Sequence, residues 1–345
     1  MRLIAILLIL IGAIAAAIFG VLRSFGHFSD ISREFSGLCT PVTGVVGPED
    51  ISIDAAGARA FISSLDRRDP NARGAIHMVD PQDPLADGGW RDLTGGVPEA
   101  FRPLGLDYYE DEEAKRLFVV NEANSGVELF DVGEDGSLTH MATFRERRLT
   151  SPNNIAAVGR RAFYVTNDLK PGRNSLMGDV HFLTRAASGY ALYSDGAIWR
   201  LAADKLRFAN GIDISPDGRT VYVAESAGMS LRIYKRNPDT GALRETEKIT
   251  LNATPANLSV DEDGVLWIGA LPKPLSVPLH EADPRHLSPS QAFRLSPGGD
   301  LESVYLDDGS EISASTVAAH LNGTLMIGAL FENKFLLCDL PDGAE

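Results

Sequence analysis

The chain has 345 residues, of which 44% are apolar, a formal net charge of −15 and an isoelectric point near 4.9. This apolar content is sufficient for one domain with a large buried core. The strong negative charge argues against nucleic acid as a partner, because the phosphates of the backbone would be repelled.

An uncharged apolar run covers residues 3–20 and lies between Arg2 and Arg23. About 18 residues is near the minimum that spans a bilayer, so residues 1–23 are predicted to be either a signal anchor or a signal peptide. We favour a retained anchor because the apolar run continues beyond the small residues at positions 13–17. The polar residues 24–37 are predicted to form a linker, and the globular part to lie outside the cytoplasm, in a periplasmic, lumenal or extracellular space, or to be secreted.

A short phrase recurs six times along residues 38–345, each time ahead of a turn and a β-rich run. The period is about fifty residues, which is typical of a β-propeller with several strands in each repeat. The sequence therefore predicts an all-β fold, a six-bladed β-propeller with a central channel, preceded by an N-terminal hydrophobic helix. The six copies are Pro48-Glu49-Asp50-Ile51, Pro103-Leu104-Gly105-Leu106, Pro152-Asn153-Asn154-Ile155, Ala209-Asn210-Gly211-Ile212, Ala256-Asn257-Leu258-Ser259 and Ser315-Thr316-Val317-Ala318.

Four of the six copies carry a Glu or an Asn at one matched phase, namely Glu49, Asn153, Asn210 and Asn257. The innermost strand of every propeller blade begins at the same end of the channel, so these side chains are expected to converge on the axis. One carboxylate and several amide oxygens suit a hard cation, and calcium is the natural occupant.

The two cysteines of the chain, Cys39 and Cys338, bracket the repeats. A propeller commonly closes its ring by pairing an N-terminal strand with C-terminal strands, which would bring the two thiols together. A disulfide there would close a loop of about 300 residues and stabilise the fold by several kcal/mol in the loop-entropy description. The alternative is a pair of buried free thiols.

Residues 170–193 fall between two repeats and are apolar on several faces. They are expected to form either a helix or lid over the channel mouth, or a long surface insertion. Within this segment, His181 is the one remaining histidine expected to approach the channel. His77, His140 and His320 lie in or beside strand-like runs and are expected to be packing or surface residues.

Several stretches resemble the paraoxonase and arylesterase family. The resemblance runs from about Cys39 to Leu340 and implies a six-bladed propeller with two calcium ions in its channel, a disulfide between the two ends, and hydrolysis of ester or lactone bonds. The stretches include Glu49-Asp50, Val127-Glu128-Leu129-Phe130, Thr166-Asn167-Asp168, Phe208-Ala209-Asn210-Gly211-Ile212, Ser215-Pro216-Asp217-Gly218 and Cys338-Asp339-Leu340.

The resemblance implies two ligand sets, and each has lost one anionic member. A catalytic calcium would be held by Glu49, Asn153, Asn210 and Asn257, with Ala256 in place of a family aspartate. A structural calcium would be held by Asp50, the main-chain carbonyl of Leu106, and Asn154, where the family has an aspartate. Because calcium affinity depends on the charge of the ligands, one or two ions are expected and both sites are weakened.

The histidine pair of the family is absent, since Leu104 and Glu122 stand at the matching positions, and a further family histidine is replaced by Leu169. Glu122 is therefore the candidate catalytic residue, either as a general base or as a substitute calcium ligand, with a solvated loop glutamate as the alternative. Asp107, Asn121 and Asp168 are candidate partners nearby.

Two functions follow from these residues. The first is a membrane-anchored, calcium-dependent hydrolase of the arylesterase/lactonase type that acts on a small-molecule ester or lactone. The alternative is a catalytically inactive, calcium-stabilised propeller that serves as a binding or scaffold module. No pattern for a nucleotide, haem or flavin is present in the sequence.

Overall fold

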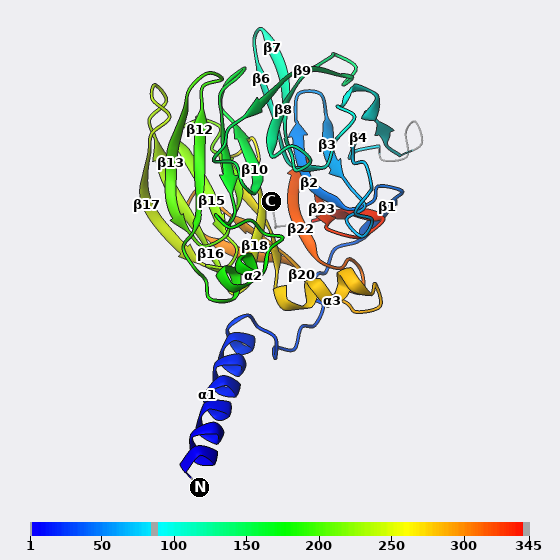
Figure 1. Cartoon of the computed structure of the whole chain (residues 1–345). Coiled ribbons are helices and arrows are strands. Elements are labelled where there is room, and N and C mark those ends of the chain that lie inside the picture. The colour runs from blue at the N-terminus through cyan, green and yellow to red at the C-terminus, as the bar shows by residue number, and fades with distance from the viewer. Residues whose placement is uncertain (1, 84–88, 341–345) are drawn as a thin grey trace.

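The computed structural model describes residues 2–83 and 89–340 and consists of a ring of six four-stranded antiparallel sheets with one projecting helix (Figure 1). The six-bladed propeller and the N-terminal hydrophobic helix predicted from the sequence are both confirmed. The helices are α1 (Arg2–Ser24), α2 (Leu176–Leu183) and α3 (Val277–Ala282), with short 3-10 turns at Thr94–Gly96 and Pro274–Ser276.

Each blade places its first strand at the channel, where neighbouring first strands contact one another around the ring. These inner strands are largely buried, whereas outer strands such as β17 are mostly exposed. The inner strands are β2 (Pro48–Asp54), β6 (Pro103–Asp111), β10 (Pro152–Ala157), β14 (Ala209–Ile214), β18 (Thr254–Val260) and β22 (Ser315–Leu321).

The remaining strands follow outward in each blade. The second strands are β3 (Arg59–Ser64), β7 (Ala114–Asn121), β11 (Phe163–Asn167), β15 (Thr220–Glu225), β19 (Leu266–Leu271) and β23 (Thr324–Ala329). The third strands are β4 (Ala75–Val79), β8 (Gly126–Val132), β12 (Gly189–Ser194), β16 (Ser230–Arg236), β20 (Ser290–Leu295) and β24 (Lys334–Asp339). The outer strands are β5 (Arg91–Asp92), β9 (Leu138–Arg145), β13 (Trp199–Leu206), β17 (Leu243–Thr250), β21 (Leu301–Asp307) and β1 (Cys39–Thr43).

The core consists of apolar side chains packed between adjacent blades. Phe118 of β7 and Phe163 of β11, for example, are fully buried with ring centroids 5.5 Å apart. Burial of a large aromatic side chain contributes about 1.5–3 kcal/mol, and every blade boundary contains such contacts. The packing between blades therefore holds the inner strands at fixed positions around the channel.

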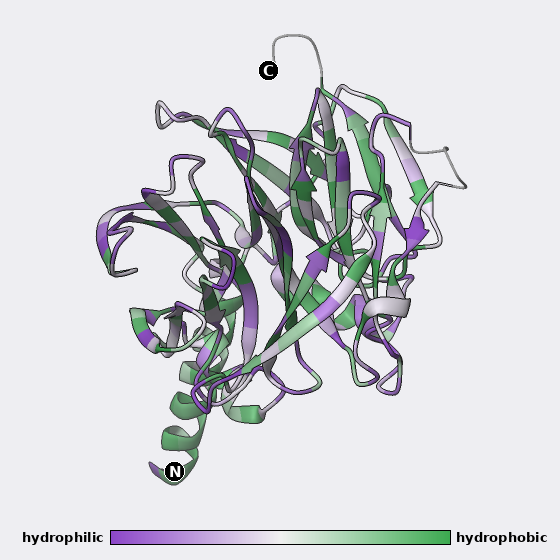
Figure 2. Ribbon diagram, turned by 90° about the horizontal axis from the view of Figure 1, so that it is seen from above, coloured by the Kyte–Doolittle hydropathy of each residue, from purple (hydrophilic) through white to green (hydrophobic). Residues whose placement is uncertain are grey.

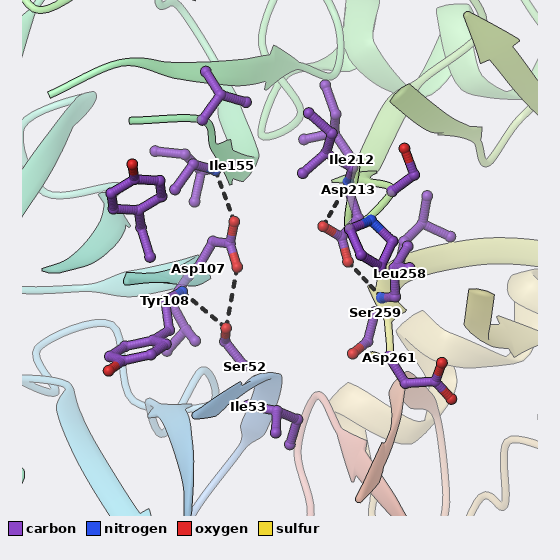
Figure 3. A pocket seen from close by; sticks show the side chains of 18 of the residues that line it. Ser52, Ile53, Asp107, Tyr108, Ile155, Ile212, Asp213, Leu258, Ser259 and Asp261 are labelled. Carbon is purple, nitrogen blue, oxygen red and sulfur yellow. Dashed lines mark hydrogen bonds between the residues drawn. The ribbon is translucent and has the colours of Figure 1, made fainter. Parts of the chain in front are cut away.

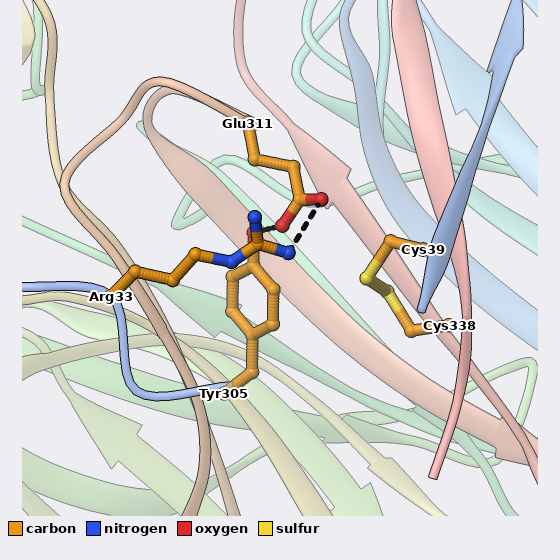
Figure 4. The surroundings of a disulfide bond; sticks show 5 residues. All are labelled: Arg33, Cys39, Tyr305, Glu311 and Cys338. Carbon is orange, nitrogen blue, oxygen red and sulfur yellow. Dashed lines mark hydrogen bonds and ion pairs between the residues drawn. A yellow bond between two sulfur atoms is a disulfide. The ribbon is translucent and has the colours of Figure 1, made fainter. Parts of the chain in front are cut away.

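The ring closes where β1 pairs with β24 in the last blade. Cys39 lies opposite Cys338 in this pairing, and the two form a disulfide across 299 residues of sequence (Figure 4). The linker packs beside this joint, where Arg33 pairs with Glu311 at 3.0 Å and the Glu311 carboxylate also accepts a hydrogen bond from Tyr305 (Figure 4). The disulfide expected from the sequence is present.

Helix α1 carries no buried residue and is apolar along most of its length (Figure 2). Among the described residues, α1 is the one helix that is both long enough and apolar enough to cross a membrane. Signal sequences share this property. The first residue after α1 contacts the folded domain. Phe25 is fully buried, stacks on Phe182 of α2 at 5.3 Å and lies under the guanidinium of Arg185.

The disulfide generates a stability prediction. Replacing Cys39 and Cys338 together by serine should lower the free energy of unfolding by about 2–5 kcal/mol, because the unfolded chain is no longer closed into a large loop. Thermal unfolding under non-reducing conditions measures the change. Reductant should bring the wild-type protein to the stability of the variant and leave the variant itself unaffected; equal stability of the oxidised wild type and the variant would contradict the prediction.

Candidate functional site

Every inner strand has a β-bulge near its first residues. The pairing register with the second strand shifts between Pro48 and Asp50, Pro103 and Leu106, Pro152 and Ile155, Ala209 and Ile212, Pro255 and Leu258, and Ser315 and Val317. A bulge bends the strand and re-aims a side chain, and bulges are frequent beside active sites. The repeated phrase in the sequence therefore marks a repeated bulge.

One residue from each bulge lines a cavity of about 390 Å³ at this end of the channel. We call this set the outer ring, and its members are Glu49, Leu104, Asn153, Asn210, Ala256 and Thr316. In β18 the outer-ring residue is Ala256. The sequence pattern matched Asn257, which is one residue further along the chain, to this position. Asn257 lies one position further along the strand and does not line the cavity.

Three buried oxygens of the outer ring accept no hydrogen bond from the described residues, namely Glu49 Oε2, Asn153 Oδ1 and Asn210 Oδ1. The side-chain nitrogens of the two asparagines have acceptors: Asn153 Nδ2 donates to Asp168 at 3.4 Å, and Asn210 Nδ2 donates to Ser226 Oγ at 3.0 Å. An unpaired buried polar atom costs about 1–3 kcal/mol, so a partner is required. One carboxylate and two amide oxygens are hard donors, and this part of the predicted calcium site fits a hard cation.

The electrostatics of Glu49 point the same way. Burial raises the pKa of the Glu49 carboxyl, and the Arg67 charge and the hydrogen bond from Asn257 offset only part of that effect. Asn257 Nδ2 donates to Glu49 Oε1 at 3.0 Å and to the Glu49 main-chain oxygen at 2.8 Å, which orients the carboxylate. The negative charge of Glu49 is therefore under-compensated by its surroundings, as expected beside a cation site.

The next residue of each bulge forms a second layer, which we call the inner ring. Its members are Asp50, Gly105, Asn154, Gly211, Asn257 and Val317. Two of them must be glycine, because a Cβ on Gly105 would lie 2.5 Å from Asn154 Cα and one on Gly211 would lie 2.4 Å from the Ala256 oxygen. The glycines make room for the three polar side chains to meet.

The polar members of the inner ring satisfy one another. Asn154 Nδ2 donates to Asp50 Oδ2 at 3.0 Å and to Asn257 Oδ1 at 2.9 Å. Asp50 also accepts the N–H groups of Ile51 at 3.0 Å and Leu106 at 2.9 Å. The Asp50 carboxylate is thus surrounded by donors, and Leu106 meets it through its N–H. Burial and then the Glu49 charge still raise the pKa of the Asp50 carboxyl well above its usual range, so these donors compensate its charge only in part. The hydrogen bonds of the residues predicted for a structural calcium are thus satisfied within the protein, whereas the charge of Asp50 is not.

Glu122 lines the same cavity as Glu49, immediately after β7. Its Oε1 lies 3.0 Å from Arg173 Nη1, and Arg173 Nε lies 2.6 Å from the buried Asp168. Burial raises the pKa of Asp168, and the Arg173 charge opposes this shift. The structure therefore brings Glu122 and Asp168 together through one arginine, next to Leu104 where the family resemblance implies a histidine.

The other two predicted partners lie elsewhere. Asn121 is buried and donates to Glu128 at 2.8 Å, so it supports the blade and does not reach the cavity. Asp107 lines a separate cavity of about 450 Å³, formed by later residues of the inner strands, opposite Asp213 (Figure 3). Burial raises the pKa of Asp107 to about 7, and the N–H of Ala157 and the Ser52 hydroxyl act against this shift. Asp107 is therefore not a neighbour of Glu122. Asn121 precedes Glu122 in the chain and accepts the N–H groups of Arg102 at 3.0 Å and Ala123 at 3.1 Å, although it is not among the cavity residues.

The expected helix in residues 170–193 is present as α2, and its residue Phe182 lines the cavity together with Arg173. The last residues of that range belong to β12, so the insertion is shorter than predicted. His181 hydrogen-bonds Ser188 at 2.8 Å and is not among the cavity residues. His77, His140 and His320 contact side chains of the blades, as expected.

The sequence reasoning missed the three arginines of the cavity, Arg67, Arg102 and Arg173. Arg67 lies in the loop between β3 and β4, Arg102 just before β6, and Arg173 just before α2. Arginines in loops carry no periodic signal, and their direction depends on the packing of three separate blades.

The arylesterase family model matches residues 46–340. Serum paraoxonase/arylesterase 1 of Homo sapiens is 34% identical over 323 residues, which cover 88% of this chain and 88% of that protein. This chain belongs to the arylesterase family.

Other similarities agree with this family and fold. Serum paraoxonase/arylesterase 2 of Gallus gallus is 32% identical over 352 residues, covering 96% of this chain and 98% of that protein. A solved structure described as a gluconolactonase from Xanthomonas campestris is similar with a TM-score of 0.59 and 17% identity, covering 90% of this chain and 91% of that one. At 17% identity, the similarity to the gluconolactonase structure shows the propeller fold alone.

The half-buried Asp213 generates a pH prediction. Burial and then the nearby Asp107 raise the pKa of Asp213 well above its usual range, so its ionisation is less favourable in the folded than in the unfolded state. The stability associated with protonated Asp213 is present below about pH 4, the ordinary carboxyl pKa, and is lost as the pH rises through the raised value. Urea unfolding at pH values from about 4 to 8 should show a weaker decline for Asp213→Asn than for the wild type.

The substitution carries a second effect that serves as an internal control. Asp213 accepts the N–H groups of Ile214 at 2.7 Å and Val260 at 2.6 Å, and an amide can accept only one of them. The variant should therefore be less stable at low pH by about 1–3 kcal/mol. Parallel pH profiles of the two proteins would contradict the raised pKa.

Proposed function

We propose that the chain is a calcium-dependent hydrolase that cleaves an ester or lactone bond of a small molecule in the outer-ring cavity. The observation that carries this proposal is the convergence of three unpaired buried oxygens, from Glu49, Asn153 and Asn210, on one cavity with a largely apolar wall. Membership of a family whose named relatives include arylesterases and lactonases supports the same reaction class.

The outer ring would hold the ion through Glu49, Asn153 and Asn210, and Asn257 is a further predicted ligand that already orients the Glu49 carboxylate. A bound calcium ion supplies electrophilic polarisation of the scissile carbonyl. The chain supplies binding and exclusion of water: Phe182, Phe208 and Phe331 form part of the cavity wall. A low-polarity wall strengthens the electrostatic interactions inside the cavity.

Glu122 is the proposed general base, which would take the proton from the attacking water. Arg173, itself a cavity residue, holds the Glu122 carboxylate at 3.0 Å and is anchored by the buried Asp168, so the direction of Glu122 is fixed. Leu104 has no titratable group, which leaves Glu122 as the proton acceptor at the family's histidine positions. The other role open to Glu122 is that of an anionic calcium ligand in place of the carboxylate missing at Ala256.

The activity prediction separates these roles. Phenyl acetate and a panel of lactones should be hydrolysed only when calcium is present, and a chelator should abolish turnover. Glu122→Gln should lower kcat by about 10²–10⁴-fold if Glu122 is the base, with calcium affinity unchanged. Calorimetry would instead show a loss of affinity if Glu122 is a ligand. Glu49→Gln should weaken calcium binding in either case.

Exposed Glu247 on β17 provides a control, since Glu247→Gln makes the same chemical change away from the cavity. Calcium binding without turnover of any ester or lactone would favour the second candidate function, an inactive calcium-stabilised binding module. Absence of calcium binding at sub-millimolar concentration would overturn both the metal assignment and the mechanism.

We further infer that one calcium ion binds, because the inner ring already satisfies its own polar groups. Calorimetric titration should give one ion per chain. Asn154→Asp should add a second ion, because two carboxylates would then face each other at Asp50 and require a cation. Without calcium the same variant should be less stable than the wild type. The exposed loop substitution Asn322→Asp is the matched control, and two ions in the wild type would contradict the inference.

We propose that α1 is retained as a membrane anchor with the propeller outside the cytoplasm. The support is the apolar run, which continues through Ile18 and Phe19 beyond the small residues at positions 13–17. The C-terminal end of α1 contacts the domain, where Arg185 donates to the Ser24 main-chain oxygen at 2.9 Å and Phe25 is buried against Phe182. Removal of the segment at its small residues would leave this docked end in place, so the mass of the mature chain decides between anchor and signal peptide.

A further inference from the structure

Three arginines share the cavity with the proposed calcium ligands: Arg67, Arg102 and Arg173. Arg173 has carboxylate partners, Asp168 at 2.6 Å and Glu122 at 3.0 Å. Within residues 2–83 and 89–340, neither Arg67 nor Arg102 has a carboxylate oxygen within 4.0 Å. Two of the three cations in this cavity therefore lack a direct counter-ion.

Main-chain carbonyls hold these two arginines in place. Arg67 donates to Gly47 at 3.3 Å, to Leu65 at 3.4 Å and to Pro103 at 3.1 Å. These carbonyls belong to segments of two neighbouring blades, so the guanidinium connects these two blades beside the cavity. Because both terminal nitrogens of Arg67 are fixed by backbone groups, the charge is presented to the cavity in one position.

Arg102 is anchored in the same manner, since its Nη1 donates to the Pro70 oxygen at 3.2 Å and the Ala72 oxygen at 3.1 Å. Its Nε and Nη2 have no protein partner among the described residues, nor has the Nε of Arg67, and none of these three nitrogens is a fully buried unsatisfied atom. They remain available to a ligand in the cavity. Arginine N–H groups of this kind bind carboxylate oxygens in pairs.

The charge balance of the cavity also favours the binding of an anionic group. Its lining contains three arginines and three glutamates, the latter being Glu49, Glu122 and Glu281, so a dication on the outer ring would leave the cavity net positive. Burial disfavours the charged form of Arg67, and the more distant charges of Glu49 and Glu122 oppose this effect. An anion in contact with Arg67 would compensate a charge that is otherwise expensive to bury.

We propose that Arg67 and Arg102 form a subsite for an anionic group of the substrate, so that the enzyme prefers an ester or lactone that also carries a carboxylate. This subsite deepens the proposed hydrolase function and rests on it. The carboxylate contacts the two guanidinium groups, and the aromatic and aliphatic wall around Phe182, Phe208 and Phe331 packs against the apolar body of the substrate.

The test compares two aryl acetates of similar shape that differ in charge, para-acetoxybenzoate and para-acetoxybenzamide, with the full-length chain in detergent and saturating calcium. The carboxamide makes its phenol the better leaving group, so a preference for the benzoate cannot come from the leaving group. We expect kcat/KM to favour the benzoate by about tenfold or more, since charge-assisted hydrogen bonds to two arginines stabilise its complex. Arg67→Gln and Arg102→Gln should each reduce this preference by about tenfold. Arg285→Gln, at an exposed arginine outside the cavity, should retain it.

A binding measurement keeps this subsite separate from the hydrolase function. Benzoate should bind the calcium-loaded wild-type protein and inhibit it competitively, and benzamide should bind at least tenfold more weakly. Benzoate binding that depends on Arg67 or Arg102 without any ester turnover would support the subsite and overturn the hydrolase. Turnover with equal kcat/KM for the two acetates and no preference for benzoate over benzamide would overturn the subsite and leave the hydrolase intact.

Discussion

The hydrogen bonds of Asn154 at the channel axis are the interaction on which the rest of the site depends. One amide nitrogen donates to Asp50 of β2 and to Asn257 of β18, and so connects three alternate inner strands across the axis. Asn257 in turn donates to the Glu49 main-chain oxygen, and Thr316 of β22 donates to the same oxygen at 2.7 Å. This network fills the inner ring with paired polar groups, which fixes the bulges and thereby the direction of every outer-ring side chain.

The two rings differ in their hydrogen bonding: the polar side chains of the inner ring are paired, whereas three oxygens of the outer ring are not. The inner ring therefore supports the fold, and the outer ring is the candidate binding site. The inner ring is closed, because the two glycines allow its polar side chains to reach one another. The outer ring begins one residue earlier on each strand, where the channel widens into a cavity, and its three oxygens point into space without donors. A rigid closed layer under an open one is a suitable base for a metal site, since the ligands are held before the ion arrives.

The cavity differs from the family pattern at the positions of a histidine pair and of one aspartate, and cationic groups surround these positions. Leu104 and Ala256 make parts of the wall apolar, and Glu122 brings a negative charge that Arg173 holds in place. Arg67 and Arg102 add positive charge that only a ligand can meet directly. The chemistry proposed for this channel therefore combines the family's metal electrophile with a carboxylate base and a positively charged substrate pocket.

The sequence by itself determined the number of blades, the apolar helix, the disulfide and the outer-ring positions of Glu49, Asn153 and Asn210, because each depends on a local repeat or on the two ends of the chain. The pairing of β18 places Asn257 in the inner ring, and the sequence carries the same phase, since Pro255 stands where other repeats have Pro48, Pro103 and Pro152. Only the tertiary structure placed Asp107 in the second cavity and Arg67 and Arg102 in the first. The position of a loop side chain depends on how the blades pack against one another. That packing depends on contacts between residues far apart in the chain.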